Sequence, residues 1–272
     1  MSGKGVKRAS PGASIEKNPL GDVELTDEDA QKLSGIQKEI ARTELLLERR
    51  AQEALYPVYE RRRVVLKGIS RFWPVALMNH SMFALHAQHN SDQVALSYLE
   101  DVWVARDQKE SRCFTLEFYF KENPYFSDSV LKKEYQWAPG PAAGEEKPDA
   151  DGLTDSMVDF SWERDVEPQA TKINWKDDAH NLTKLHPRVK DEDGDDMPAE
   201  GGSFFNLFED AEDPFDLGVL IANDVFPEAV EYFLGQAGGD GIDSDDEEDD
   251  EDEDDEEEID LEKPRPKKQK KA

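Results

Sequence analysis

The fold is decided by residues 26–70, which read TDEDAQKLSGIQKEIARTELLLERRAQEALYPVYERRRVVLKGIS. Thr26 is a good helix N-cap, and the three acids after it stand where the helix dipole favours negative charge. Apolar residues then recur every three or four positions, as they do on one face of a helix. A helix of about 45 residues would be about 65 Å long, which exceeds the body of a small domain. We therefore predict one long helix over residues 25–70, whose apolar face is covered partly from outside its own domain.

The simplest cover for this apolar face is the same helix from a second copy of the chain, running antiparallel. Pro57 leaves an alternative open, because an interior proline removes a hydrogen bond and clashes with the preceding turn. It predicts either a kink near Tyr56-Pro57 or two ordinary helices with a break between them. The preferred interpretation is a homodimer whose interface is formed by Leu33, Ile36, Ile40, Thr43, Leu47, Ala51 and Ala54.

Acidic residues dominate the composition. The 272 residues carry a net charge of −30, and Asp240 to Glu262 hold 18 acids without one base. So many like charges cannot share a compact structure, which predicts a disordered acidic tail over residues 238–262. An acidic protein repels nucleic acid and attracts basic partners, so little direct nucleic-acid binding is expected.

The last segment, residues 263–272, is basic. It is typical of a nuclear import signal carried by Lys267, Lys268, Lys270 and Lys271, and it is also suited to act as a counterion for the tail. A lone cysteine, Cys113, excludes an intrachain disulfide. No apolar run approaches the length of a membrane span, and the N-terminus lacks the apolar region of a secretory signal, so no membrane partner is expected.

The rest of the chain divides by composition. Residues 1–24 have almost nothing to bury and are predicted to be a disordered arm. Residues 71–237 are predicted to form one α+β domain, because short alternating strands with short connections indicate an antiparallel sheet. A flexible insertion, rich in Pro, Gly, Ala and Glu, is expected at about 138–151. Strands are expected at 102–105, 112–120, 130–137, 157–162 and 171–175, and helices at 203–208 and 217–235.

Motifs of catalysis are missing from the sequence. It contains no GxGxxG, P-loop, GxSxG or HExxH pattern, so we predict no enzyme, no catalytic residue and no cofactor. His80, His86 and His89 lie close in sequence, but no cysteine or carboxylate spacing supports a metal site. Cys113 lies inside an alternating strand, where a buried thiol is more often inert packing than a nucleophile.

Several short motifs, in a fixed order, carry a resemblance. IQKEI occupies positions 36–40, FW and NH occupy 72–73 and 79–80, and NPYF at 123–126 is followed by LKKEY at 131–135. SFFNLF at 203–208 and FPEAVEYF at 226–233 complete the series. Together with the acidic tail, the chain resembles the nucleosome assembly protein family of histone chaperones, and within it the branch of SET (template-activating factor I).

The resemblance implies a homodimer joined by the long helices, each subunit carrying an α+β "earmuff" domain. It implies that core histones, H3–H4 in preference to the other core-histone dimer, bind an acidic concave underside without catalysis. The acids implied for this surface are Glu209, Asp210, Glu212, Asp213 and Asp216, although acids there also fit the ordinary loop surface of an acidic protein. Nuclear localisation, with shuttling to the cytoplasm, is expected.

Two rival functions stay open at this point. SET-like proteins are linked with histone acetyltransferases and with phosphatase inhibition, which implies a regulatory subunit as the alternative. A structural coiled-coil adaptor is the other, and it predicts that the long helix binds partners without the α+β domain.

Overall fold

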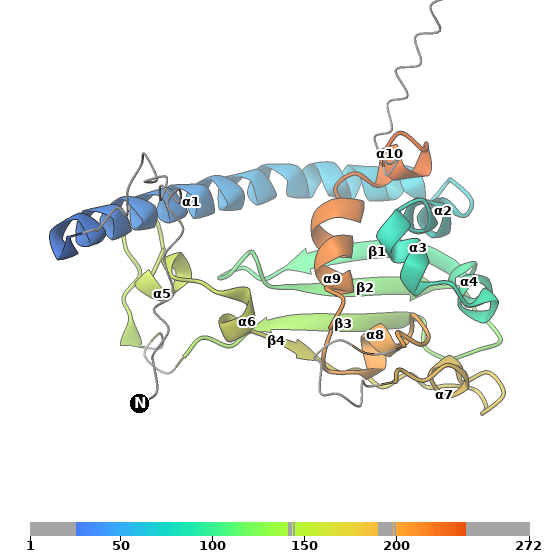
Figure 1. The fold of residues 1–272 in the computed structure, drawn as a ribbon. Helices are drawn as coiled ribbons and strands as arrows, with labels where there is room; N and C mark the ends of the chain where they lie inside the picture. Colours follow the sequence, from blue (N-terminus) through green and yellow to red (C-terminus); the bar gives the residue numbers. More distant parts are fainter. Residues whose placement is uncertain (1–25, 141–142, 144, 190–197, 199, 238–272) are drawn as a thin grey trace, which may run out of the picture. The chain divides into compact units, whose positions relative to one another are not determined.

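The computed structural model describes residues 26–140, 143, 145–189, 198 and 200–237. Its first element, α1, is one helix of 40 residues, Asp27–Leu66, drawn in blue in Figure 1. The Thr26 hydroxyl caps it by accepting a hydrogen bond from the Asp29 amide at 3.2 Å. The helix continues through Pro57 as one gently curved ribbon. The long helix is therefore confirmed, and the interpretation as two helices is wrong.

Three short helices connect α1 to the sheet. The Arg71 backbone is left-handed, with φ of 59°, and this turns the chain back beneath α1. The aromatic pair that follows is buried, and Phe72 stacks on Phe233 near the end of the domain with ring centroids 4.7 Å apart. The three helices are α2 (Phe72–Met78), α3 (Ser81–His86) and α4 (Asn90–Leu96).

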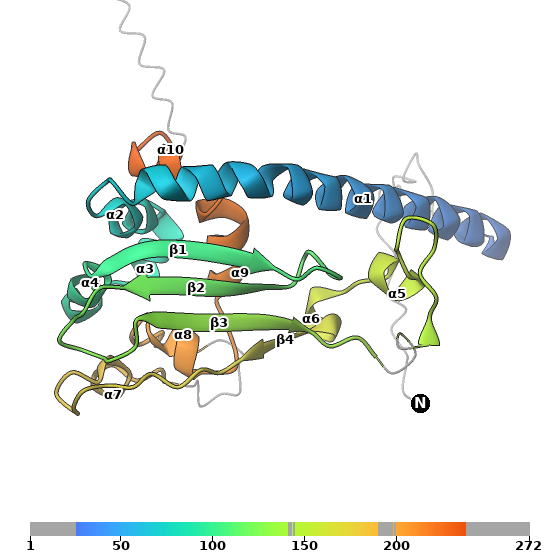
Figure 2. The same cartoon turned by 180° about the vertical axis from the view of Figure 1, so that it is seen from behind.

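The sheet is an antiparallel meander of four strands in the order β1-β2-β3-β4. In β2, Phe114, Leu116, Phe118 and Phe120 are buried, while the residues between them are only partly buried. Helices cover one face, as Figure 1 shows, and Figure 2 shows the other face with β1 to β3 in front. The expected antiparallel α+β fold is therefore present. The strands are β1 (Leu99–Arg106), β2 (Phe114–Phe120), β3 (Val130–Trp137) and β4 (Val166–Gln169).

Two of the expected strands are wrong. Residues 157–162 hold the end of helix α5 (Asp155–Val158) and the start of α6 (Trp162–Asp165). Their aromatic residues imitate strand alternation, but Phe160 lies under the Arg112 guanidinium and Trp162 packs near Phe114. Residues 171–175 contribute a single bridge, between Trp175 and Phe126. The fourth strand is instead β4. It is hard to recognise in the sequence because it has only four residues and contains a proline.

The region between β3 and β4 is attached to α1. Arg42 donates hydrogen bonds to Asp149 at 2.6 Å and Asp151 at 2.5 Å. Leu45 of α1 forms a small apolar cluster with Leu153 and Met157. One side of α1 therefore packs against the α+β domain of the same chain.

The C-terminal third packs onto the helix-covered face of the sheet. It contains α7 (Leu182–Leu185), α8 (Asn206–Glu209), α9 (Leu217–Leu220), a π-helical segment (Ile221–Val225) and α10 (Ala229–Phe233). The expected helices at 203–208 and 217–235 are thus present in shorter pieces. Phe204, Phe205 and Phe208 are fully buried among the aromatic residues of β2 and the β2–β3 turn.

Candidate functional site

The five predicted acids lie on the segment that runs from the last residue of α8 to the start of α9, and their surroundings differ. We call residues 209–216 the acidic loop. Glu209 points inward, where its carboxylate accepts hydrogen bonds from the Ile173 amide at 3.2 Å and the Trp175 indole at 3.2 Å. The Thr183 hydroxyl donates to its other oxygen at 2.5 Å. Glu209 therefore holds the loop against two neighbouring segments.

Asp213 is also engaged within the domain. Its carboxylate accepts hydrogen bonds from the Leu217 amide at 3.1 Å and the Gly218 amide at 2.8 Å, at the start of α9. The Tyr135 hydroxyl donates to it at 2.5 Å, and burial beside this carboxylate raises the pKa of Tyr135 well above its usual value. A β-carbon at position 218 would lie 1.7 Å from the Tyr135 hydroxyl, so only glycine fits there.

Asp210 and the backbone beside it are held by two bases. The Arg188 guanidinium pairs with the Asp210 carboxylate at 2.9 Å. The ammonium of Lys133, a fully buried side chain, donates to the carbonyl oxygens of Asp210 at 2.6 Å and Ala211 at 2.8 Å. Burial lowers the pKa of Lys133 to about 8. The acidic loop is thus a braced structure.

Glu212 and Asp216 are the two exposed acids of the loop. Within the part of the chain that the structure describes, neither carboxylate has a hydrogen bond or an ion pair with a side chain. Asp216 has a left-handed backbone with φ of 51°. Its pKa is raised, mainly by partial burial and to a smaller extent by the negative charges of the nearby Asp213 and Glu163. These two carboxylates are available to a basic partner.

Lys133 gives a pH-dependent prediction. In the Lys133→Met variant, two carbonyl oxygens lose their donor, which destabilises the acidic loop. The pKa of Lys133 is about 8 in the fold and 10.5 ordinarily, so between these values the unfolded chain holds more protons and the stability of the unaltered protein rises with pH. The free energy of unfolding of the unaltered protein, relative to that of the variant, should therefore grow by roughly 1 kcal/mol per pH unit between these two pKa values. Urea unfolding across this window measures the difference.

The matched control is Lys132→Met, on the opposite face of β3. Lys132 is exposed and donates to Glu117 at 2.7 Å, a hydrogen bond that raises its pKa. The advantage over this control should not grow in the same window. Equal pH profiles for the two variants would contradict the buried position of Lys133.

The predicted dimer residues lie on α1 as an exposed stripe. Leu33 is 51% exposed, Ile40 is 52% exposed and Leu47 is 59% exposed. The buried residues of α1, Leu45 and Leu66, lie on another side of the helix, which contacts the domain. Ile36, Thr43, Ala51 and Ala54 are exposed as well, and Val58 and Val65 extend the same stripe.

The histidines make separate contacts within the domain. His80 caps α3 and lies 3.1 Å from Asp224, while His89 stacks on His186 with ring centroids 3.8 Å apart. No group of three or more ligating side chains is found among the described residues. Cys113 is buried, and burial raises its pKa to about 12, which is typical of an unreactive thiol.

Two further expectations concern the C-terminal tail and membrane spans. The acidic tail and Lys267, Lys268, Lys270 and Lys271 lie outside the described residues. Among those that are described, no helix combines the length and apolarity of a membrane span.

A family model and several known proteins match most of this chain. A family model described as nucleosome assembly protein (NAP) matches residues 21–236. The chain is 28% identical over 256 residues to NAP1-related protein 2 of Oryza sativa subsp. indica, covering 89% of this chain and 90% of the rice protein. It is 28% identical over 214 residues to Protein SET of Drosophila melanogaster, covering 78% and 72%. With nucleosome assembly protein 1;1 of Arabidopsis thaliana it is 30% identical over 185 residues, covering 63% of this chain and 47% of that larger protein.

Solved structures share the fold. A structure of a Ccp1 mutant matches with a TM-score of 0.58 and 25% identity, covering 77% of this chain and 95% of that one. A structure of Vps75 matches with a TM-score of 0.54 at 18% identity, covering 78% and 99%, which is a likeness of fold alone.

Proposed function

Because the chain belongs to the nucleosome assembly protein family, we propose that it is a histone chaperone that binds core histones and promotes nucleosome assembly. The observation that carries this proposal is the family match over residues 21–236, which spans α1, the sheet and the acidic loop. The family consists of histone chaperones, so the proposed activity is reversible binding without catalysis.

The proposed mechanism is competition between charges. Histones carry many Lys and Arg residues that would otherwise collapse nonspecifically onto DNA phosphates. The exposed carboxylates of Glu212 and Asp216, on a loop that Glu209, Asp213 and Lys133 hold in place, offer a preorganised acidic surface. The 18 acids between Asp240 and Glu262 raise the local negative charge and speed capture. DNA, with its denser array of phosphates, then takes over the histones.

We propose further that the chain works as a homodimer through α1. The exposed stripe of Leu33, Ile40 and Leu47 supports this, because a row of apolar side chains more than half exposed over several turns is unfavourable in water. A second copy would bury it.

Three finer statements are proposals as well: a preference for H3–H4, a nuclear location aided by Lys267, Lys268, Lys270 and Lys271, and shuttling to the cytoplasm. The alternative is that the chain regulates an enzyme. It would then act on a histone acetyltransferase, as a cofactor or as an inhibitor that masks the substrate, or it would itself inhibit a phosphatase. Deletion of residues 240–272 separates these, since docking onto an enzyme through the domain should survive it and masking by the tail should not.

The experiment that tests the function is a titration of the full-length protein with H3–H4 at several salt concentrations. The affinity should fall steeply with salt, because the contacts are ionic and exposed. Glu212→Gln combined with Asp216→Asn should weaken binding about tenfold near 0.1 M salt and much less at high salt. The control is Glu122→Gln with Glu228→Gln, which removes equal charge at exposed positions outside the acidic loop. A flat salt profile, or equal losses in both variants, would contradict the proposal.

A further inference from the structure

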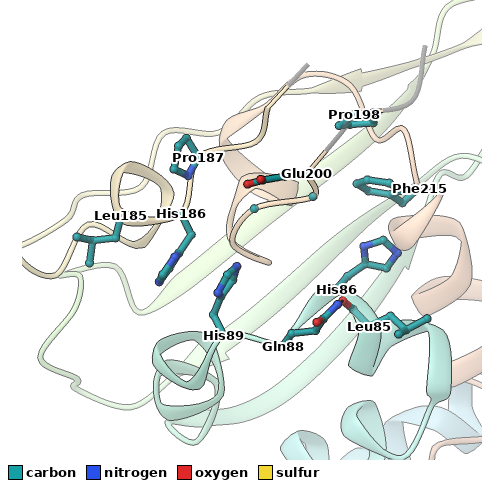
Figure 3. Close-up of a pocket in the computed structure, with 12 residues that line it drawn as sticks. Leu85, His86, Gln88, His89, Leu185, His186, Pro187, Pro198, Glu200 and Phe215 are labelled. Carbon is teal, nitrogen blue, oxygen red and sulfur yellow. The ribbon is translucent and has the colours of Figure 1, made fainter. Parts of the chain in front are cut away.

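A hollow of about 600 Å³ lies beside the acidic loop. Its lining comes from the end of α3, the segment before α4, the end of α7, Pro198, residues 200–202 and Phe215. In Figure 3 the labelled side chains form a row, with Leu185 at one end, His186 and His89 in the middle, and His86 and Leu85 at the other end. Pro198 and Glu200 lie across the hollow from this row.

Several aromatic and imidazole rings in the lining of the hollow contact one another. His89 and His186 stack almost parallel, with an interplanar angle of 9°, and His186 lies 3.3 Å from the Ser91 hydroxyl. His86 packs on Phe215 with ring centroids 4.3 Å apart, and the Arg188 guanidinium lies over the same Phe215 ring. These contacts hold the rings of the lining in place.

The two ends of the row are apolar and open to solvent. Leu85 is 55% exposed and Leu185 is 50% exposed. Half-exposed leucines on either side of flat rings offer a surface that gains free energy when an apolar side chain covers it.

The hollow and the acidic loop are continuous. Phe215, which forms part of the wall, lies in sequence between Asp213 and Asp216, and the carboxylate of Glu200 lies at the opposite side. A bound chain that places Lys or Arg on Glu212 and Asp216 would thus bring its neighbouring residues over Leu85 and Phe215. A basic segment that carries an apolar residue between its charges fits both features.

We propose that this hollow receives an apolar side chain of the bound histone, flanked by basic residues that pair with the acidic loop. This inference rests on the proposed function and adds to it a contact that salt does not screen. The acidic loop supplies attraction that fades as salt rises, whereas apolar burial persists. Binding is then expected to have two separable components.

The test is the variant Leu85→Ser with Leu185→Ser in the full-length protein, titrated with H3–H4 at low and high salt. Both leucines are half exposed, so the fold should be unaffected. Affinity should fall by about tenfold at every salt concentration, because two leucines lose their apolar cover. The acidic-loop variant, by contrast, should lose much less affinity at high salt than at low salt. The control is Val75→Ser with Val94→Ser, which replaces valines that are 38% and 41% exposed on α2 and α4, outside the hollow.

Three results would overturn the inference, each in a distinguishable way. Unchanged affinity of the leucine variant, with normal histone binding, would leave the proposed function standing and remove the hollow from it. A lower melting temperature of the histone-free variant would show that the chain covers the hollow itself. Failure of the unaltered protein to bind H3–H4 at low salt would remove the proposed function and this contact together.

Discussion

A protein that carries Ile40→Asp and Leu47→Asp is expected to sediment as a single chain, whereas the unaltered protein sediments as a dimer. Both side chains are more than half exposed in one chain, at 52% and 59%, so the substitutions cost the isolated chain little. In a symmetric dimer each substitution occurs twice, which places four carboxylates in an apolar interface. Each loses apolar burial and leaves a charge without a partner, so the dimer should weaken by at least about ten-thousandfold.

The spacing of the stripe indicates how two copies meet. If the two-fold axis passes near position 49 of an antiparallel pair, Leu33 faces Val65, Ile40 faces Val58 and Leu47 faces Ala51. The acids at 27–29 then approach Lys67, at the end of α1 in the other copy. This arrangement places opposite charges at both ends, whereas a parallel pair would bring like charges together.

Sedimentation equilibrium over a range of protein concentrations measures the dimer. Glu53→Gln with Glu60→Gln is the matched control, because both residues are exposed on α1 and lie outside the stripe. The control should remain dimeric. If the aspartate variant remains dimeric too, the stripe is not the interface and the coiled-coil adaptor becomes the better starting point for α1.

The sequence predicted the elements in which local pattern and tertiary contacts agree. α1 has an N-cap, acids in its first turn and a regular apolar period, and all of these depend on residues close in sequence. β2 alternates without exception because one face of the sheet is buried. Residues 157–162 have a similar alternation, but there Thr154 caps a short helix and Arg112 holds Phe160. The contact between Arg112 and Phe160 is distant in sequence and leaves no local signal.

For the acidic loop, too, the sequence predicts the local features and not the contacts between distant residues. The sequence indicated that five acids cluster after Phe208, and the structure places them on one loop. It could not indicate that Glu209 and Asp213 are engaged internally, because their partners Trp175 and Tyr135 lie tens of residues away. One signal was available and missed: Lys133 stands between Leu131 and Tyr135 at an inward position of an alternating strand. A lysine in that position indicates a buried acceptor.

Asp92→Ala is expected to destabilise the domain by about 3 kcal/mol. The Asp92 carboxylate is fully buried and accepts two hydrogen bonds, from the Ser203 hydroxyl at 2.7 Å and the Phe204 amide at 2.7 Å. It thereby joins α4 to the start of the buried segment that ends at the acidic loop. Alanine leaves both donors without an acceptor inside the core. Thermal and urea unfolding measure the loss, and the exposed Asp178→Ala should change stability by less than about 0.5 kcal/mol.

The Asp92→Asn variant separates the shape of this side chain from its charge. An amide oxygen still accepts the Phe204 hydrogen bond, and the Ser203 hydroxyl can rotate, so the loss should be smaller than with alanine. Burial raises the pKa of Asp92, and the two hydrogen bonds reduce the shift only partly. A carboxyl group whose pKa is raised by folding binds protons more tightly in the native state, so its contribution to stability increases as pH falls. The advantage of the unaltered protein over Asp92→Asn should therefore grow between neutral pH and the ordinary range of aspartate. An advantage that shrinks as pH falls would mean that the hydrogen bonds outweigh burial, and that Asp92 is held as a stabilised anion.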